Sequence, residues 1–178
     1  AMTTTTSARV HLRLGDSSQP WDPEGSTTIL KSTLGAASII DWRGEIASLF
    51  PDFSIISPVA SGALSRVFEI IDRATQEPFA LKAVPFPPEI SSVGARLERE
   101  WQVLSTLVHP NVVRGHSACR SKTAFFLLME FVAGMSLQQK VARYGPLPPR
   151  LAAKYISEAA CGLAAAHAAG VVHRDVKP

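Results

Sequence analysis

Residues 173–178, with the sequence HRDVKP, place the carboxylate of Asp175 between two cations, Arg174 and Lys177. A carboxylate can accept the proton of an attacking hydroxyl, and a nearby ammonium can neutralise a phosphoryl group in transfer. An alanine-rich stretch and the apolar pair at 171–172 precede the segment, so we expect a tight loop that presents Asp175 at a helix end. This arrangement suits phosphoryl transfer, but taken alone it is explained at least as well by an ion pair in a surface loop.

A second pair of charges lies on apolar faces upstream. Lys82 belongs to FALKAV, a strand-like run of otherwise apolar residues. Glu100 lies three positions after Leu97 and four before Leu104, which puts its carboxylate on the apolar face of a helix. Burying an unpaired charge is costly, so contact between Lys82 and Glu100 would satisfy both groups. Alternatively, Lys82 extends to water at a strand end and Glu100 lies at the margin of the apolar stripe.

The turn VASGALSRV, residues 59–67, is the third feature of this kind. Its small residues around Gly62 leave backbone N–H groups uncovered, which suits phosphate binding. Hairpins of small residues are mostly plain turns, so this feature alone does not establish a phosphate-binding loop.

The elements that would position these residues follow from hydrophobic periodicity. Five short runs rich in Val, Ile, Phe and Leu predict strands, at residues 53–59, 65–72, 79–86, 112–118 and 124–132. Hairpin connections are expected at 73–78 and 119–123. One helix interrupts the strands, with an apolar stripe of Val93, Leu97, Trp101, Leu104 and Val108. Two helices follow, one ending at Gly145 and a longer one ending at Gly170. The predicted fold class is α+β, a small five-stranded antiparallel sheet carrying one helix and followed by helices.

Composition divides the chain into four regions. Residues 1–40 form a Ser/Thr-rich lead segment that we expect to be flexible. Residues 41–51 form a short helix, capped by Asp41, that packs through Trp42 and Leu49 against the next region of the chain. The sheet region spans 52–132 and the helical region 133–178.

The net charge and the cysteines exclude several classes of protein. The net charge of +3 comes without any long run of like charges, which argues against nucleic-acid binding. No apolar stretch is long enough to span a membrane. Cys119 and Cys161 lack metal-site spacing and are expected to be reduced core thiols, which favours a cytoplasmic protein.

The order and spacing of these motifs over residues 52–178 resemble the first half of a eukaryotic-type (Hanks-type) serine/threonine protein kinase domain. The stretch 155–178 is similar to the bacterial branch of that family. The resemblance implies the protein-kinase fold, with a complete N-lobe sheet, a hinge and the start of an incomplete C-lobe. It also implies ATP and Mg²⁺ as cofactors and proteins as substrates.

The resemblance assigns roles at the nucleotide. Lys82 would hold the α- and β-phosphates and pair with Glu100. Met129 would be the gatekeeper, with the backbone of Glu130 and Val132 at the adenine edge. The other implied nucleotide-binding residues are Val59, Ala60, Ser61, Gly62, Ser65, Val67 and Ala80.

The resemblance also assigns roles in transfer. Asp175 would be the catalytic base, and Lys177 matches the lysine typical of serine/threonine kinases. Arg174 matches the arginine that meets an activation-loop phosphate in regulated members.

Two departures from the family pattern bear on activity. Ala60 and Ser65 replace two of the three loop glycines, which adds side chains where backbone should approach phosphate. The family's Mg²⁺ ligands, an Asn beyond Pro178 and a later Asp-Phe-Gly, are not in this chain, so we expect these 178 residues by themselves to be inactive. Self-association through apolar surface on residues 151–168 is also expected. The alternative function is a non-catalytic, pseudokinase-like module that acts by binding a protein.

Overall fold

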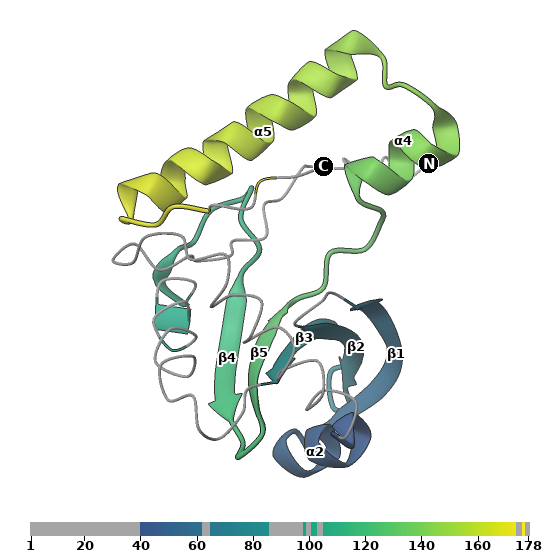
Figure 1. The fold of residues 1–178 in the computed structure, drawn as a ribbon, viewed down its shortest axis with the longest axis vertical. Helices are drawn as coiled ribbons and strands as arrows, with labels where there is room; N and C mark the ends of the chain where they lie inside the picture. Colours follow the sequence, from purple (N-terminus) through teal and green to yellow (C-terminus); the bar gives the residue numbers. More distant parts are fainter. Residues whose placement is uncertain are drawn as a thin grey trace, which may run out of the picture. The chain divides into compact units, whose positions relative to one another are not determined.

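The computed structural model describes residues 40–61, 65–85, 98, 101–102, 105–173 and 176. These residues form two compact units (Figure 1). The sheet unit takes in the described residues up to Ser105 together with Gly115–Phe131, and the helical unit takes in Thr106–Arg114 and the described residues from Val132 onward. The segment 106–114 therefore groups with the helices, whereas the sequence analysis included it in the sheet region.

The sheet unit contains a five-stranded sheet, as the sequence predicts, and its strands lie in the order β1-β2-β3-β5-β4. Every neighbouring pair of strands is antiparallel. The strands are β1 (Phe53–Ser61), β2 (Arg66–Asp72), β3 (Pro78–Pro85), β4 (Gly115–Arg120) and β5 (Ala124–Glu130). β4 begins later than the predicted residue 112, because Val112 and Val113 are buried within the helical unit instead.

The Asp72 carboxylate is one of the groups that stabilise the hairpin between β2 and β3, together with backbone hydrogen bonds across the turn. Asp72 accepts hydrogen bonds from the backbone N–H groups of Ala74 and Thr75, at 2.8 and 2.9 Å. The Thr75 hydrogen bond is the main reason that the pKa of Asp72 lies below its ordinary value. Gln76 adopts a φ of 60°, so the tight turn is closed without a glycine.

Alternation along the strands gives the sheet two different faces. Phe68, Ile70, Leu81 and Ala83 are buried on one face, whereas the residues between them in β2 and β3 are half-buried. Because successive side chains point to opposite faces, this alternation marks one dry face and one partly accessible face. β5 is buried on both faces from Ala124 to Met129.

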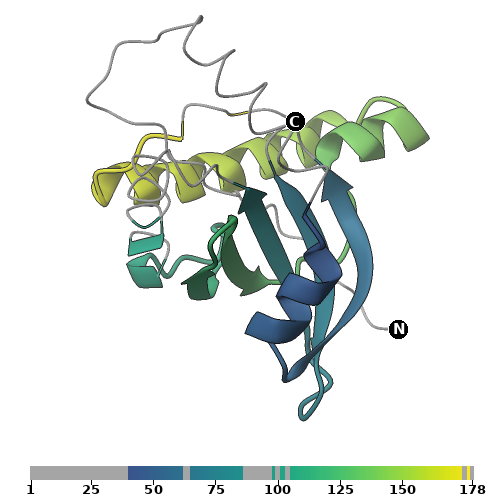
Figure 2. The same cartoon turned by 60° about the horizontal axis from the view of Figure 1, so that its bottom comes forward.

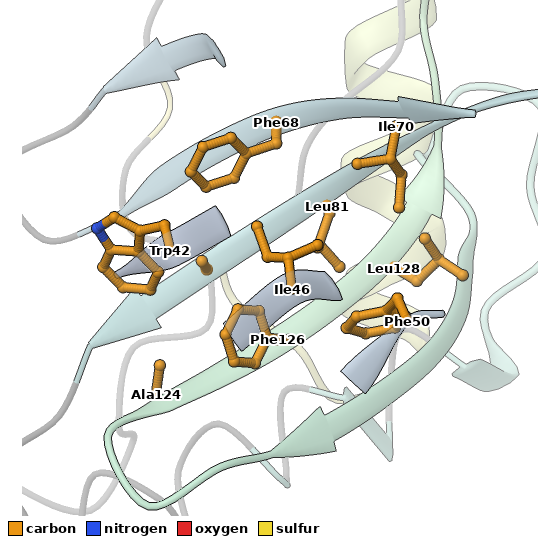
Figure 3. Packing of buried hydrophobic residues seen from close by; sticks show 10 residues of the cluster. Trp42, Ile46, Phe50, Phe68, Ile70, Leu81, Ala124, Phe126 and Leu128 are labelled. Carbon is orange, nitrogen blue, oxygen red and sulfur yellow. The ribbon is translucent and has the colours of Figure 1, made fainter. Parts of the chain in front are cut away.

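Helix α2 (Trp42–Leu49) covers the dry face (Figure 2). The Asp41 side chain caps it by accepting a hydrogen bond from the N–H of Gly44, as predicted. Trp42, Ile46 and Phe50 lie over the sheet and join one core cluster with its side chains (Figure 3). Burying a side chain of this size contributes about 1.5–3 kcal/mol.

Aromatic rings form much of this core. The Phe126 ring lies edge-on to both Trp42 and Phe50, with centroids 6.2 and 6.1 Å apart. Leu49, which the sequence pattern placed on the buried face, is only partly buried at the edge of the cluster. Phe50, directly after the helix, takes the more central place.

Between β3 and β4, the described residues up to 106 are helical, at 98, 101–102 and 105–106. The rest of the predicted apolar stripe, at 93, 97 and 104, lies outside the described residues. Val108 is not part of that stripe: it follows the helical residues and is 74% exposed. The chain has left the helix there to enter the turn at 110–111.

The helical unit contains α4 (Leu137–Tyr144) and α5 (Pro149–Ala168), close to the predicted helices. A capping box formed by Ser136 and Gln139 starts α4. A proline in its first turn starts α5, and Gly170 follows its end with a φ of 77°. In the part of the chain that is described, none of the helices has the length and apolarity needed to cross a membrane.

The prediction of two core thiols is wrong for one cysteine. Cys119 in β4 is partly buried against the sheet core, and this burial raises the pKa of its thiol. Cys161 on α5 is exposed. It precedes the buried Gly162 by one residue, which rotates its side chain about 100° around the helix from the packed face.

Candidate functional site

The site begins with Lys82 in the middle of β3. Its register partners are Val67 in β2 and Leu127 in β5, and directly paired residues project from the same face of a sheet. Leu81 and Ala83, on either side of Lys82, are fully buried toward α2. Lys82 therefore lies half-buried on the other face, which we call the site face.

A small side chain and a buried methionine lie next to this lysine. Ala80 is on the site face, two residues before Lys82, and pairs with Met129 of β5. Met129 therefore projects from the site face as well, where its side chain is buried at 3% exposure. The methyl group of Ala80 projects only a short distance from the sheet, so a flat ligand could approach the backbone here. A flat, apolar area thus adjoins an ammonium group.

The loop between β1 and β2 begins in the same row of the sheet as Lys82. Ala60 pairs with Val67, so one row of register partners runs from Ala60 through Val67 and Lys82 to Leu127. With strands about 4.8 Å apart, the backbone of Ala60 lies about 10 Å from that of Lys82. An irregular register between Pro58 and Ala60 bends β1 just before the loop.

The remaining residues of the predicted nucleotide site lie at the ends of strands. Val59 is about half exposed, Ser65 is half-buried directly before β2, and Ser61 ends β1 opposite Arg66. Glu130 ends β5 opposite Phe79. Val132 is exposed and belongs to the helical unit, so its place beside the others stays a prediction.

Five predicted residues fall outside the described part of the chain: Gly62, Glu100, Arg174, Asp175 and Lys177. The contact between Lys82 and Glu100 and the catalytic roles at 174–177 therefore stay predictions. His173, which directly precedes them, is described and is buried in the helical unit at 7% exposure.

Sequence reasoning missed a close contact in the helical unit. The backbone of Gly162 in α5 lies so near the segment 109–113 that a Cβ there would come within 2.6 Å of the Asn111 carbonyl oxygen. Asn111 is itself buried, and its N–H donates to Nδ1 of His109 at 3.1 Å. The signal in the sequence was a lone glycine within an alanine-rich helix, since glycine there costs about 1 kcal/mol relative to alanine and needs a packing reason.

The described site face fits part of a nucleotide. Half-buried apolar positions around Ala80 can cover a planar ring, and the Lys82 ammonium can hold an anionic group a few ångströms away. Within the described ranges, no three His, Cys, Asp or Glu side chains form a cluster that could bind a metal. The chemistry available from the described residues is thus anion binding beside an apolar platform.

Comparison with known proteins accounts for this arrangement. Residues 53–178 match the protein kinase domain family. The chain is 33% identical over 135 residues to serine/threonine-protein kinase PknD of Mycobacterium tuberculosis, covering 75% of this chain and 20% of PknD. It is 32% identical over 131 residues to serine/threonine-protein kinase RAD53 of Saccharomyces cerevisiae, covering 73% of this chain and 16% of that protein.

A solved structure shares the fold. The crystal structure of Rad53 residues 1–466 in complex with AMP-PNP matches with a TM-score of 0.65 and 32% sequence identity, over 73% of this chain and 34% of the Rad53 chain. The chain spans about a fifth or less of the length of these two curated relatives. Helix α2 lies before the family match, which begins at Phe53, the first residue of β1.

Proposed function

The chain belongs to the protein kinase domain family, and on this premise we propose that its parent protein transfers the γ-phosphate of ATP to serine and threonine hydroxyls of protein substrates. The observation that carries the proposal is the row from Ala60 through Lys82 to Leu127, which joins the β1–β2 loop to a half-buried lysine on the site face. The relatives are named as serine/threonine kinases, and they favour the enzyme over a non-catalytic binding module.

Within this function, each described residue has a defined task. We propose that Lys82 binds the α- and β-phosphates, and that Ala80 and Val67 contact the adenine ring. Met129 limits the depth of the site, because its buried side chain stands at the register position beside Ala80. The backbone of Glu130 is proposed to hydrogen-bond the adenine edge. AMP-PNP in the Rad53 structure, an ATP analogue, is consistent with nucleotide binding on such a face.

Transfer itself depends on residues beyond those described. We propose Asp175 as the base that accepts the proton of the substrate hydroxyl, with Lys177 beside the transferred phosphate and Glu100 paired to Lys82. Arg174 is proposed to respond to phosphorylation of an activation loop. Mg²⁺, when bound, neutralises charge on the β- and γ-phosphates.

A matched pair of lysine variants tests the function in the full-length protein. Lys82→Met should lower kcat/KM for phosphate transfer from radiolabelled ATP to a general protein substrate by about 100-fold or more, because electrostatic positioning of the phosphates is lost. Lys154→Met is the control, since Lys154 is exposed on α5 and pairs only loosely with Glu158 at 3.8 Å. The control should stay within about twofold of wild type. Full activity in Lys82→Met would refute the assignment.

The 178-residue chain by itself is proposed to have no measurable transferase activity and at most weak ATP affinity. Turnover by this chain that disappears in Asp175→Asn would contradict the proposal. Activity that appears only in the full-length protein would support it.

We further propose a bacterial, cytoplasmic parent protein. The bacterial assignment rests on the stretch 155–178, since the relatives include bacterial and eukaryotic proteins at similar identity. The cytoplasmic assignment rests on two free cysteines, Cys119 and Cys161. Fractionation of the source cells, followed by immunodetection of the full-length protein, tests the location.

A further inference from the structure

The carboxylate of Glu45, on helix α2, is hydrogen-bonded to the turn between β4 and β5. Its Oε2 accepts a hydrogen bond from the Ser121 hydroxyl at 2.9 Å, and its Oε1 accepts one from the Thr123 hydroxyl. Both oxygens of one carboxylate are thus bound by two hydroxyls that lie 76 and 78 residues away in sequence. We call this arrangement the Glu45 clamp.

The two hydroxyls differ in how firmly the turn holds them. Ser121 Oγ accepts from the backbone N–H groups of Thr123 and Ala124, at 3.1 and 3.0 Å, so it is built into the turn. Thr123 Oγ1 contacts Glu45 and, at 3.2 Å, Ser121 Oγ. Thr123 is half-buried and follows the exposed Lys122. Its hydroxyl is therefore the more readily freed of the two.

The clamp depends on hydroxyl hydrogens. An ionised carboxylate has no donor, so each of its hydrogen bonds requires an O–H from the turn. Esterifying the Thr123 hydroxyl with phosphate removes that hydrogen. It also places a charge of about −1.5 to −2 against the Glu45 carboxylate. An attractive contact thereby becomes a repulsive one.

From this chemistry we propose that Thr123 is a phosphorylation site that controls how α2 sits on the sheet. In the modifying step, Thr123 Oγ1 attacks the γ-phosphorus of ATP, and the bond from that phosphorus to the β,γ-bridging oxygen breaks. ADP leaves with the electron pair, and the hydroxyl proton passes to a carboxylate of the acting serine/threonine kinase. The exposed Lys122 beside Thr123 places positive charge on the turn and favours a kinase with an acidic substrate groove, whereas Arg120 pairs with Glu98 at 3.8 Å.

Movement of α2 would have consequences because of the surface that it covers. Trp42, Ile46 and Phe50 form one side of the core, and Phe68, Phe126 and Leu128 of the sheet form the other. Phosphorylation loosens the helix from this seat and exposes apolar surface on both sides. The site face lies on the opposite side of the same strands, so β3 and β5 connect the seat of α2 to Lys82 and Met129.

The first measurement is the modification itself. The full-length protein is purified from the cells that produce it, and a second sample is incubated with ATP, Mg²⁺ and a serine/threonine kinase that prefers basic substrates. Mass spectrometry of the peptide containing residues 121–123 should find phosphate on Thr123. A Thr123 that stays unmodified in both samples overturns the proposal.

The second measurement is the seating of α2. Hydrogen exchange of residues 42–49 is compared between full-length protein with threonine and with genetically encoded phosphothreonine at position 123. In the phosphorylated form, the backbone amides of residues 42–49 should exchange about tenfold faster, because α2 opens more often. Equal protection in the two forms overturns the proposal.

Charge reversal at position 45 distinguishes repulsion between phosphate and Glu45 from a non-specific disruption of the turn by the phosphate. In Glu45→Lys, the effect of phosphorylation on α2 should be reversed. Helix α2 of the unmodified variant should exchange faster than that of wild type, and phosphothreonine at 123 should restore its protection. Phosphothreonine that loosens α2 equally in wild type and in Glu45→Lys contradicts the proposal. None of these measurements depends on the transferase activity of this protein itself, so failure of the proposed function leaves the test intact.

Discussion

The sheet unit and the helical unit differ in how far the apolar side chains of their short helices are covered, since α2 buries Trp42 and Ile46 whereas α4, described along its whole length, has no buried residue. In the sheet unit, Ile70, Leu81 and Phe126 are 0% exposed, and α2 supplies the second layer. In the helical unit, Ile156 is 65% exposed and Val141 43% exposed. These two residues belong to an open groove of about 490 Å³ between α4 and α5, lined by Leu137, Gln138, Val141, Ala142, Leu147, Ala152, Tyr155 and Ile156.

The difference shows that an amphipathic sequence pattern does not by itself tell which apolar helix face is covered by another element of the same unit. Both units carry amphipathic helices of ordinary length. The apolar side of α2 packs on one face of the five-stranded sheet. The apolar groove of the helical unit is open, as expected of a surface that binds another surface.

The largest difference between the two units is expected when an aromatic ring is removed from the core beneath α2. Phe126→Ala should lower the free energy of unfolding by about 3–5 kcal/mol, because Phe126 is fully buried between Trp42 and Phe50. Ile156→Ala, at an exposed position, should cost about 0.5 kcal/mol or less. Urea unfolding followed by tryptophan fluorescence measures both, and similar losses would refute the contrast.

Within the helical unit, the contact at Gly162 should behave like a core. Gly162→Ala should destabilise the unit by about 1–3 kcal/mol, since the new methyl group meets the Asn111 carbonyl. In an unhindered helix the same change would stabilise by about 1 kcal/mol, so the sign is diagnostic. Cys161→Ala, at the exposed neighbouring position, serves as the control. Thermal unfolding followed by far-ultraviolet circular dichroism provides the measurement, and a rise in stability for Gly162→Ala would exclude the close approach.

The open groove predicts self-association of the 178-residue chain. Ile156→Lys should weaken this association by about tenfold, because a charge would have to be desolvated on contact, while leaving stability nearly unchanged. Val108→Lys, at an exposed valine outside the groove, is the matched control. Sedimentation equilibrium of the three chains measures the association constants. Equal association of all three would show that the groove is not the contact.

The smallest effect concerns the cysteines, one in each unit. Burial raises the pKa of Cys119, so its thiol stays protonated to higher pH than an ordinary thiol of pKa 9.0. At pH about 8, a soluble disulfide reagent should label the exposed Cys161 about tenfold faster than Cys119. Mass spectrometry of timed samples gives both rates. Faster labelling of Cys119 would mean that β4 opens readily.

The five strands and their antiparallel hairpins could be predicted because the β pattern repeats locally, whereas the insertion of β5 between β3 and β4 could not. The alternation around Lys82 marks Leu81 and Ala83 as buried, and the short connections at 73–78 and 119–123 make neighbouring strands antiparallel. Helix α2 was predictable for the same reason, through its Asp41 cap and the spacing of Trp42 and Ile46.

Contacts between distant residues could not be predicted in this way. Nothing in the local pattern of Glu45 predicts hydroxyl partners at 121 and 123, because the sequence around a glutamate on a short helix would look the same without them. The burial of Asn111 under α5 and the exposure of Val108 likewise depend on where the chain leaves the sheet unit. Local periodicity carries no information on that point.

The position of β5 in the sheet has a consequence for synthesis on the ribosome. β1, β2 and β3 pair with strands next to them in sequence, so they can form a meander as soon as residue 85 emerges. β3 then waits for its other neighbour, β5, which ends at Glu130. Helix α2 is made first, yet its seat includes Ala124, Phe126 and Leu128 and is complete only when those residues arrive. The growing chain therefore exposes the aromatic side chains of a half-formed core for the time needed to add some 45 residues, about 2–9 s at typical elongation rates, and this exposed surface is prone to aggregation during that interval.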